Sequence, residues 1–126
     1  MKYTAVKENH LYKKAYTKGK KFCGRLVAVH VLPDFAAERI KNARPDKKYV
    51  NRIGIATSKK IGGAVVRSRV RRIIREGYRA VERELPLRTG KIVILAARSA
   101  AANAKSTDIA VELRRALYAV DMVKKV

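Results

Sequence analysis

The spacing of apolar residues predicts two long helices. Over residues 63–84, apolar and small side chains recur at intervals of three and four, which traces one stripe along a helix. Pro86 ends that segment. A last helix follows, capped by Ser106 or Thr107. The two stripes consist of Val66, Val70, Ile73, Ile74, Gly77 and Val81 in the first helix, and of Ile109, Leu113, Ala116, Leu117 and Val120 in the second.

Runs of β-branched and apolar residues predict three strands. The first covers residues 22–32 and ends at Pro33. In residues 50–58, larger side chains alternate with small ones, so one face of the strand admits the close approach of a ligand or of a packed helix. Residues 91–97 are apolar without alternation, which is typical of a strand covered on both faces. The last two strands flank the long helix, and we therefore predict that they are parallel.

The remaining segments complete a mixed architecture. Residues 8–18 predict a short helix, with Asn9 as its cap and Gly19 as its stop. Residues 34–49 are polar and are interpreted as a long flexible loop, in which residues 35–43 can form a short helix. The predicted order is α-β-β-α-β-α, an α+β fold with one sheet and both long helices against one of its faces.

Composition and charge narrow the class of partner. The chain has 126 residues, which fits one domain over residues 1–126. It contains 31 Lys and Arg residues and 10 Asp and Glu residues, which give a formal net charge of +21. A folded domain with this excess repels itself unless an anion lies against it, so we predict a polyanionic partner, nucleic acid first and an anionic membrane surface as the alternative. The single cysteine, Cys23, excludes an intramolecular disulfide and a Cys-based zinc site. Because the chain has neither an apolar run of about 20 residues nor a hydrophobic signal region, we expect a soluble cytoplasmic protein.

Positive charge concentrates on the long helix. Arg67, Arg71 and Arg75 form one row at a spacing of four residues, and Arg69 lies near the edge of the apolar stripe. A merely solvated face mixes both signs of charge, whereas here the acidic residues appear only in the second half of the helix. The planar guanidinium fork of arginine matches phosphate oxygens, so we predict a phosphate-binding face. Further arginines beside the row are Arg72, Arg79 and Arg83.

The approach to this helix adds a second basic feature. Lys59 and Lys60 precede Gly62 and Gly63, which lead into the helix. Exposed N–H groups at a helix N-terminus can bind a phosphate. The alternative is that the two glycines only form a tight turn.

Aromatic residues gather in the first 22 residues, interleaved with lysines. Aromatic faces and cations can form a platform for unpaired bases, worth roughly 1–3 kcal/mol per stacked base. Alternatively, Tyr12 and Tyr16 pin the short helix to the sheet, and Phe22 is a core residue. Enzyme chemistry by the polypeptide is not indicated, because His10 and His30 have no evident partner and the carboxylates form no recognised metal-binding pattern.

The stretch from Arg52 to Arg75, RIGIATSKKIGGAVVRSRVRRIIR, resembles the signature of the bacterial ribonuclease P protein subunit. That family has a strand ending in Ser-Lys-Lys, a Gly-Asn-Ala-Val turn, and a helix that opens Arg-Asn-Arg-x-Lys-Arg-x-x-Arg. Arg71 replaces the lysine of this pattern, while Gly63 and Ser68 replace its two asparagines. The matching positions are Ser58, Lys59, Lys60, Gly62, Ala64, Val65, Arg67, Arg69, Arg72 and Arg75.

The resemblance implies both a fold and a function. The fold would be like domain 2 of ribosomal protein S5, with a left-handed βαβ crossover where the general rule is right-handed. The function would be that of the protein subunit of ribonuclease P, an endoribonuclease that removes the 5′ leader of precursor tRNA to form the mature 5′ end. The RNA subunit would supply the catalysis and, with the substrate, hold Mg²⁺, so no catalytic or metal-binding residue is assigned to this chain. The implied partners are the ribonuclease P RNA and precursor tRNA, without a membrane or an obligate protein partner.

The resemblance also assigns residues to two sites. Two other classes of nucleic-acid-binding protein remain as alternatives. The alternatives are a general RNA-binding protein, such as a ribosomal protein or a chaperone, and a nucleoid-type DNA binder. The implied RNA-binding residues are Lys59, Lys60, Arg67, Ser68, Arg69, Arg71, Arg72 and Arg75. The implied leader-binding cleft contains Tyr12, Tyr16, Phe22 and Arg52.

Overall fold

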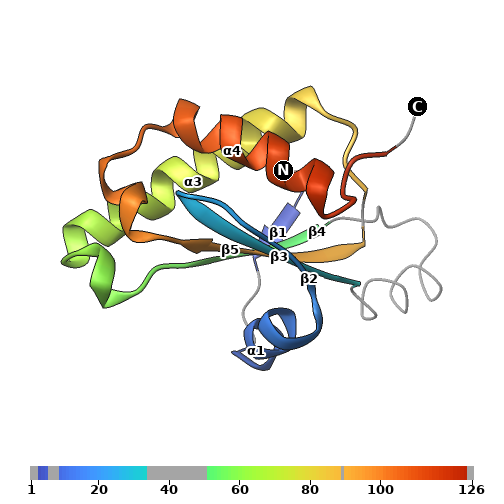
Figure 1. The fold of residues 1–126 in the computed structure, drawn as a ribbon, viewed down its shortest axis with the longest axis horizontal. Helices are drawn as coiled ribbons and strands as arrows, with labels where there is room; N and C mark the ends of the chain where they lie inside the picture. The colour runs from blue at the N-terminus through green and yellow to red at the C-terminus, as the bar shows by residue number, and fades with distance from the viewer. Residues whose placement is uncertain (1–2, 6–8, 34–50, 89, 125–126) are drawn as a thin grey trace.

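A computed structural model describes residues 3–5, 9–33, 51–88 and 90–124 (Figure 1). The loop predicted over residues 34–49, with its short helix, lies outside these ranges. In chain order the elements are β1 (Tyr3–Ala5), α1 (Asn9–Lys18), β2 (Lys20–Cys23), β3 (Val27–Pro33), β4 (Asn51–Ala56), the 3₁₀ turn η1 (Lys59–Ile61), α3 (Ala64–Glu84), β5 (Lys91–Ala97), the 3₁₀ turn η2 (Ser99–Asn103) and α4 (Ser106–Ala119).

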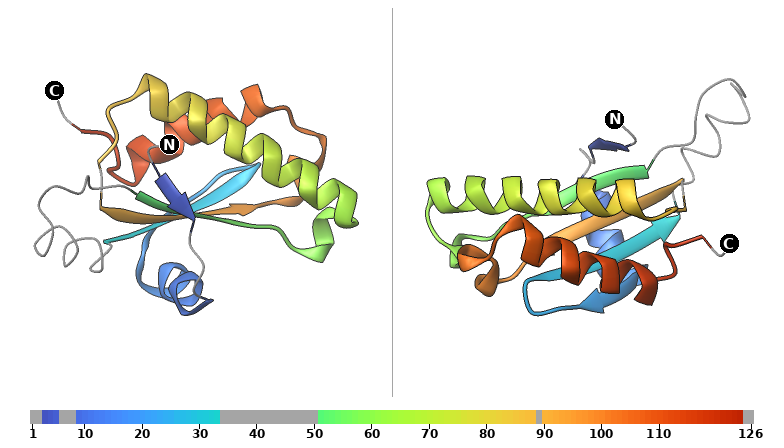
Figure 2. Two further views of the ribbon diagram at one scale, coloured as in Figure 1. Left: turned by 180° about the vertical axis from the view of Figure 1, so that it is seen from behind. Right: turned by 90° about the horizontal axis from the view of Figure 1, so that it is seen from above.

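The strands form one five-stranded mixed sheet in the order β1-β4-β5-β3-β2. β4 runs parallel to β1 and β5, while β3 runs antiparallel to β5 and β2. Helices α3 and α4 cover one face of the sheet, and α1 lies on the opposite face (Figures 1 and 2). The α+β fold, the parallel pairing across the long helix and the placement of both long helices on one face are therefore confirmed.

The prediction of a single strand over residues 22–32 is wrong, because the structure has a hairpin of two strands there. β2 and β3 pair antiparallel, and the N–H of Gly24 donates to the carbonyl of Val27 at 3.0 Å to close the turn. The three-residue strand β1 was also not predicted; it pairs with β4, whose residues lie far along the sequence.

A distant carboxylate explains why the chain turns at this point. Glu112 of α4 accepts hydrogen bonds from the N–H groups of Arg25 at 2.8 Å, Leu26 at 2.9 Å and Val27 at 2.7 Å. A Cβ on Gly24 would lie only 2.5 Å from the Glu112 side chain, so a larger residue there would displace the carboxylate from the turn. The hairpin is therefore held by a residue that belongs to the last helix.

The helix ends differ slightly from the predicted caps. Helix α4 begins at Ser106 with Lys105 as its cap, and the Lys105 N–H donates to the Asp108 carboxylate at 3.0 Å, so neither Ser106 nor Thr107 is the cap. Helix α1 begins at Asn9 itself. Gly19 does stop α1, because its N–H donates to the Ala15 carbonyl at 3.1 Å.

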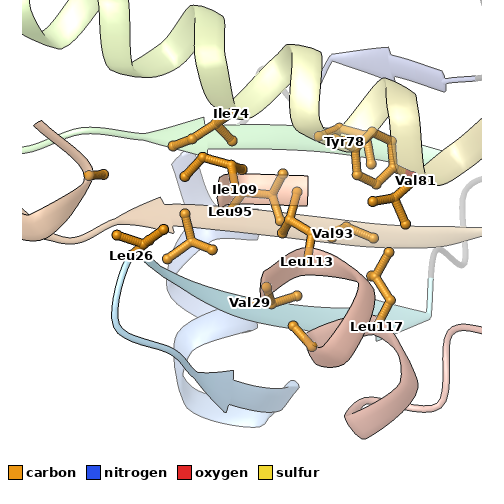
Figure 3. Close-up of a cluster of buried hydrophobic side chains, with 14 of the residues drawn as sticks. Leu26, Val29, Ile74, Tyr78, Val81, Val93, Leu95, Ile109, Leu113 and Leu117 are labelled. Carbon is orange, nitrogen blue, oxygen red and sulfur yellow. The ribbon is translucent and has the colours of Figure 1, made fainter. Parts of the chain in front are cut away.

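The main core lies between the sheet and the pair α3 and α4 (Figure 3). It contains Val29 and Leu95 from the sheet, Ile74 and Tyr78 from α3, and Leu113 from α4. Tyr78 was not among the predicted stripe residues, yet it is 1% exposed. The buried side chain extends the stripe by one position and broadens the face that α3 packs against the sheet.

A second, smaller core lies under α1. Leu32, Ile92 and Ile94 of the sheet pack there against Ala15 and Tyr12 of α1. β5 thus contributes side chains to both cores, which confirms that this strand is covered on both faces.

Candidate nucleic-acid interface

The entry to α3 combines exposed lysines with two glycines of different kinds. Lys59 and Lys60 are exposed in η1. Gly62 has φ +152°, and a Cβ there would lie 3.0 Å from Val66, so the backbone requires glycine. Gly63 caps α3 with φ −71° and has nothing within 4 Å of an added Cβ, so this place tolerates a side chain. The N-cap residue Gly63 makes no side-chain hydrogen bond to the start of α3, and N–H groups at a helix start can bind a phosphate.

The outward face of α3 carries the predicted arginines. Arg72 and Arg75 are exposed and have no hydrogen bond or ion pair with any other described residue. Arg67 is half-buried, and its Nε is buried without a hydrogen-bond partner in the part of the chain that the structure describes. An arginine guanidinium group that has no partner within the protein can bind a phosphate through two parallel hydrogen bonds.

Arg71 ties this face to the end of β4. Its Nη1 donates to Thr57 Oγ1 at 2.9 Å, and its Nη2 lies 3.4 Å from Ser68 Oγ. Ser68, which stands where the resembling family has asparagine, therefore retains a polar contact through its hydroxyl. The contact orients one arginine of the row along the helix.

Arg69 makes a different set of contacts from its neighbours on α3. Its Nη1 donates to the carbonyl of Ala102 at 3.0 Å, and its Nη2 donates to the carbonyl of Ala104 at 2.9 Å. Both carbonyls belong to η2 and the residue that follows it. Arg69 therefore fastens α3 to the segment that leads into α4, a role that its position at the edge of the stripe did not reveal.

Two tyrosines of α1 lie against the other face of the sheet. A Cβ on Gly54 would come within 2.5 Å of Tyr12 Oη, so the small face of β4 receives a packed helix. The Tyr16 ring is 42% exposed and meets the His30 ring edge-on, with 4.8 Å between the ring centroids. Burial raises the pKa of both tyrosines, and the neighbouring Tyr12 contributes to that rise at Tyr16. Tyr12 thus pins α1 to the sheet, while Tyr16 keeps an open side.

The strand register brings two further polar residues to the α1 side of the sheet. Lys21 pairs with His30, and His30 pairs with Ile94, which packs against α1. Burial, and then the charge of Lys21, lower the pKa of His30. Arg52 shares this face, because it pairs with Ile92. We call Tyr12, Tyr16, Lys21, His30 and Arg52 the α1-facing surface. Lys21 is one of the lysines interleaved with the early aromatics in the sequence, whereas His30 was given no role there, and only the correct register places it on this face.

Phe22 does not belong to the α1-facing surface. It pairs with Val29, whose side chain lies in the main core, and it packs against that core. The sheet separates Phe22 from Tyr12 and Tyr16. The predicted cleft set is thus divided, with three of its members on one face and Phe22 on the other.

The part of the chain that the structure describes holds neither a metal cluster nor a helix that could cross a membrane. In residues 3–5, 9–33, 51–88 and 90–124, no three His, Cys, Asp or Glu side chains gather closely enough to hold a metal ion. No helix in the same ranges is long and apolar enough to cross a membrane.

Known proteins are similar to this chain in sequence and in fold. The Ribonuclease P family profile matches residues 1–121. The ribonuclease P protein component of Clostridium acetobutylicum is 36% identical over 109 residues, which cover 86% of this chain and 82% of the relative. That of Clostridioides difficile is 29% identical over 117 residues, which cover 93% and 91%.

Solved structures agree with the sequence relatives. The RNase P protein of Staphylococcus aureus matches with a TM-score of 0.72 at 23% identity, over 98% of this chain and 99% of that one. The RNase P protein of Thermotoga maritima matches with a TM-score of 0.68 at 15% identity, over 96% and 98%. The family profile and the sequence relatives define the class as a component of a ribonucleoprotein nuclease of tRNA processing. The chain belongs to the ribonuclease P protein family.

Proposed function

We propose that this chain is the protein subunit of ribonuclease P, which binds the RNA subunit and the 5′ leader of precursor tRNA and so assists removal of the leader. The observation that carries the proposal is the outward face of α3, where Arg72 and Arg75 are exposed beyond the lysine-rich turn. Cations arranged in this way neutralise phosphates and release their counterions, which gives strong binding to folded RNA at low salt.

The α1-facing surface supports contact with a single strand. Tyr16 keeps an exposed ring side, and Lys21 and Arg52 add positive charge on the same face. An aromatic ring beside cations can stack an unpaired base and hold the adjoining phosphate. This surface and the outward face of α3 are separate, so two parts of an RNA assembly can be bound at once.

In this proposal the RNA subunit carries out the cleavage, and Mg²⁺ is held by that RNA and by the substrate. The polypeptide lies between two polyanions in the cytoplasm, lowers their mutual repulsion and needs no obligate protein partner. The protein should therefore matter most when Mg²⁺ is scarce.

Reconstitution with a bacterial ribonuclease P RNA tests this role. At low Mg²⁺, the wild-type protein should restore precursor cleavage, whereas the protein without RNA should cleave nothing specifically. The double variant Arg72→Gln and Arg75→Gln should lose most of the stimulation. The control with Arg25→Gln and Arg115→Gln removes the same charge from exposed residues outside α3 and should retain it. Specific cleavage by the RNA-free protein, or equal loss in both variants, would contradict the proposal.

Competition binding separates the leader role from general RNA binding. Precursor tRNA should compete better than mature tRNA for the assembled complex. Equal competition would favour a general RNA-binding protein, and equal affinity for duplex DNA and for ribonuclease P RNA would favour a nucleoid-type protein.

A further inference from the structure

A basic pocket of about 340 Å³ lies at the far end of the molecule from the start of α3. It is formed by the end of α1, the start of β2, the end of β3, the segment after α3, the start of β5 and the turn after α4. The 21 residues of α3 extend over about 30 Å at 1.5 Å per residue, and Arg88 of the pocket follows the last of them. The pocket is thus separate from the arginines at the beginning of α3.

The pocket has an apolar floor and a charged rim. Val31, Val120 and Met122 are buried beneath it. Lys20 pairs with Val31, whose side chain lies in the main core, so Lys20 is on the α4 side of the sheet. Lys91 pairs with Pro33, which is two residues after Val31 on the same strand, so Lys91 is on that side too. The opening therefore differs from the α1-facing surface, and Lys18 reaches it from the last residue of α1. The rim carries four cationic side chains and a single carboxylate, namely Lys18, Lys20, Arg88, Lys91 and Asp121.

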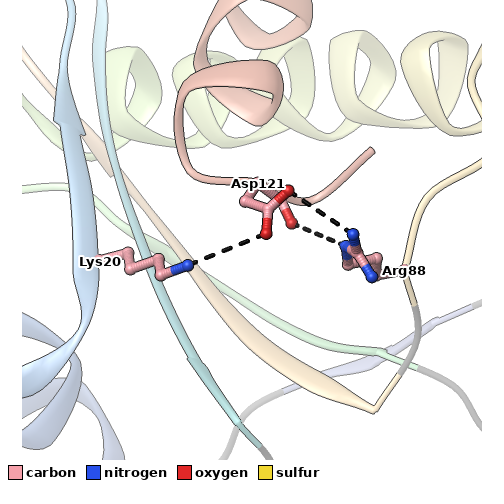
Figure 4. Close-up of polar contacts among 3 residues, drawn as sticks. All are labelled: Lys20, Arg88 and Asp121. Carbon is pink, nitrogen blue, oxygen red and sulfur yellow. Dashed lines mark hydrogen bonds and ion pairs between the residues drawn. The ribbon is translucent and has the colours of Figure 1, made fainter. Parts of the chain in front are cut away.

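The lone carboxylate is already shared, as Figure 4 shows. Asp121 lies 4.0 Å from Lys20 Nζ and 3.6 Å from Arg88 Nη2. Arg88 is further fixed by its Nε, which donates to the Asp121 carbonyl at 3.0 Å, and by its N–H, which donates to the Met122 carbonyl at 2.7 Å. Within the described ranges, neither Lys18 nor Lys91 has a carboxylate partner. The rim thus holds more positive charge than its own acid neutralises.

The end of α4 does not account for these cations. Its last carbonyls are bonded within the chain, because Val120 N–H donates to Ala116 and Met122 N–H donates to Leu117. Lysine and arginine near a helix C-terminus often serve such carbonyls, but here the backbone serves Ala116 and Leu117, and Arg88 donates to the carbonyl of Asp121. Lys18 and Lys91 are therefore available to an external anion.

We propose that this pocket binds one phosphate group of an RNA strand, held by Lys18 and Lys91 and by the guanidinium of Arg88. Lysine ammonium groups supply the charge, the preorganised arginine supplies directed donors, and the apolar floor accommodates the sugar or base attached to the phosphate. The identity of the anion as RNA rests on the proposed function, whereas the phosphate chemistry rests on the pocket itself. RNA bound along α3 would thus gain a distant third point of contact.

Salt-dependent binding to ribonuclease P RNA tests the pocket. The variant Lys18→Gln with Lys91→Gln leaves the contacts of Asp121 intact and should reduce the slope of log K against log salt concentration by about one. The control Arg25→Gln with Arg115→Gln removes two charges elsewhere and should reduce the slope less. Equal slopes in the two variants would overturn the proposal, with unchanged circular dichroism showing that both variants are folded.

A second measurement distinguishes the source of the phosphate. The backbone amide signals of Arg88 and Lys91 should shift in NMR spectra when ribonuclease P RNA is added, and less when inorganic phosphate or adenosine monophosphate is added at equal phosphate concentration. Saturation by either small molecule, with no response to RNA, would overturn the assignment to an RNA strand. If wild-type protein does not bind the RNA at all, the proposed function fails as well, whereas a failure of the pocket alone leaves wild-type binding and cleavage intact.

Discussion

Replacing Arg69 with alanine should destabilise the fold, although Arg69 lies among arginines assigned to RNA. The change removes two hydrogen bonds, from Nη1 to Ala102 and from Nη2 to Ala104, and it leaves the two carbonyls without this donor. One hydrogen bond from a charged donor contributes roughly 1.5–3 kcal/mol. Because the side chain is half-exposed and water replaces part of these bonds, we expect a loss of about 2 kcal/mol in the free energy of unfolding.

Urea unfolding monitored by circular dichroism measures this loss as a lower midpoint at an unchanged slope. Arg72→Ala is the matched control, since Arg72 lies on the same helix, is exposed and has no partner among the described residues. It should change stability by less than about 0.5 kcal/mol. In RNA binding the order should reverse, with Arg72→Ala giving the larger decrease in salt slope. Equal stability of the two variants would refute the reasoning about Arg69.

Three further predictions concern packing and titration. Tyr16→Ala should weaken the binding of precursor tRNA more than that of mature tRNA. If the ratio of the two affinities does not change, Tyr16 only packs against the sheet and does not contact the leader. Gly77→Ala should lower the free energy of unfolding by roughly 1–3 kcal/mol, seen as a lower urea midpoint. A Cβ there would lie 2.8 Å from Ile109, and this clash outweighs the usual gain of alanine in a helix. Burial and Lys21 lower the pKa of His30, so the unfolded chain binds the proton first as pH falls below 6.5. Stability should therefore decline below that pH, and His30→Gln should weaken this decline in urea titrations across pH.

The long periodic segments could be predicted from the sequence, while the short ones could not. Helix α3 was predicted over 63–84 and spans Ala64–Glu84, and β5 was predicted with the observed bounds, because many residues report each pattern. The hairpin was missed because Gly24 alone marks its turn and the anchoring carboxylate comes from Glu112. Strand β1 has three residues and gains its partner from far along the chain, so no local signal defines it.

The missed turn also bears on Phe22, which the family resemblance assigns to the leader cleft. In an unbroken strand over 22–32, Phe22 would share a face with His30, since side chains alternate from one face to the other. The turn resets this alternation and pairs Phe22 with Val29 of the main core. The arginine face of α3 needed only helical geometry and was predicted, whereas the contacts of Arg69 depend on carbonyls that only the folded chain brings near.

The anchoring of the first hairpin by Glu112 has a consequence for the order in which the chain folds. The hydrogen bond from Arg25 to Glu112 joins residues 87 positions apart, so during synthesis the hairpin turn stays without its anchor until almost the whole chain has been made. β2 lies at the edge of the sheet, and an edge strand is the kind of strand that pairs with other chains. Its two lysines, Lys20 and Lys21, disfavour such pairing by like-charge repulsion. Part of the positive charge of this protein thus protects an edge of the sheet from association with other chains.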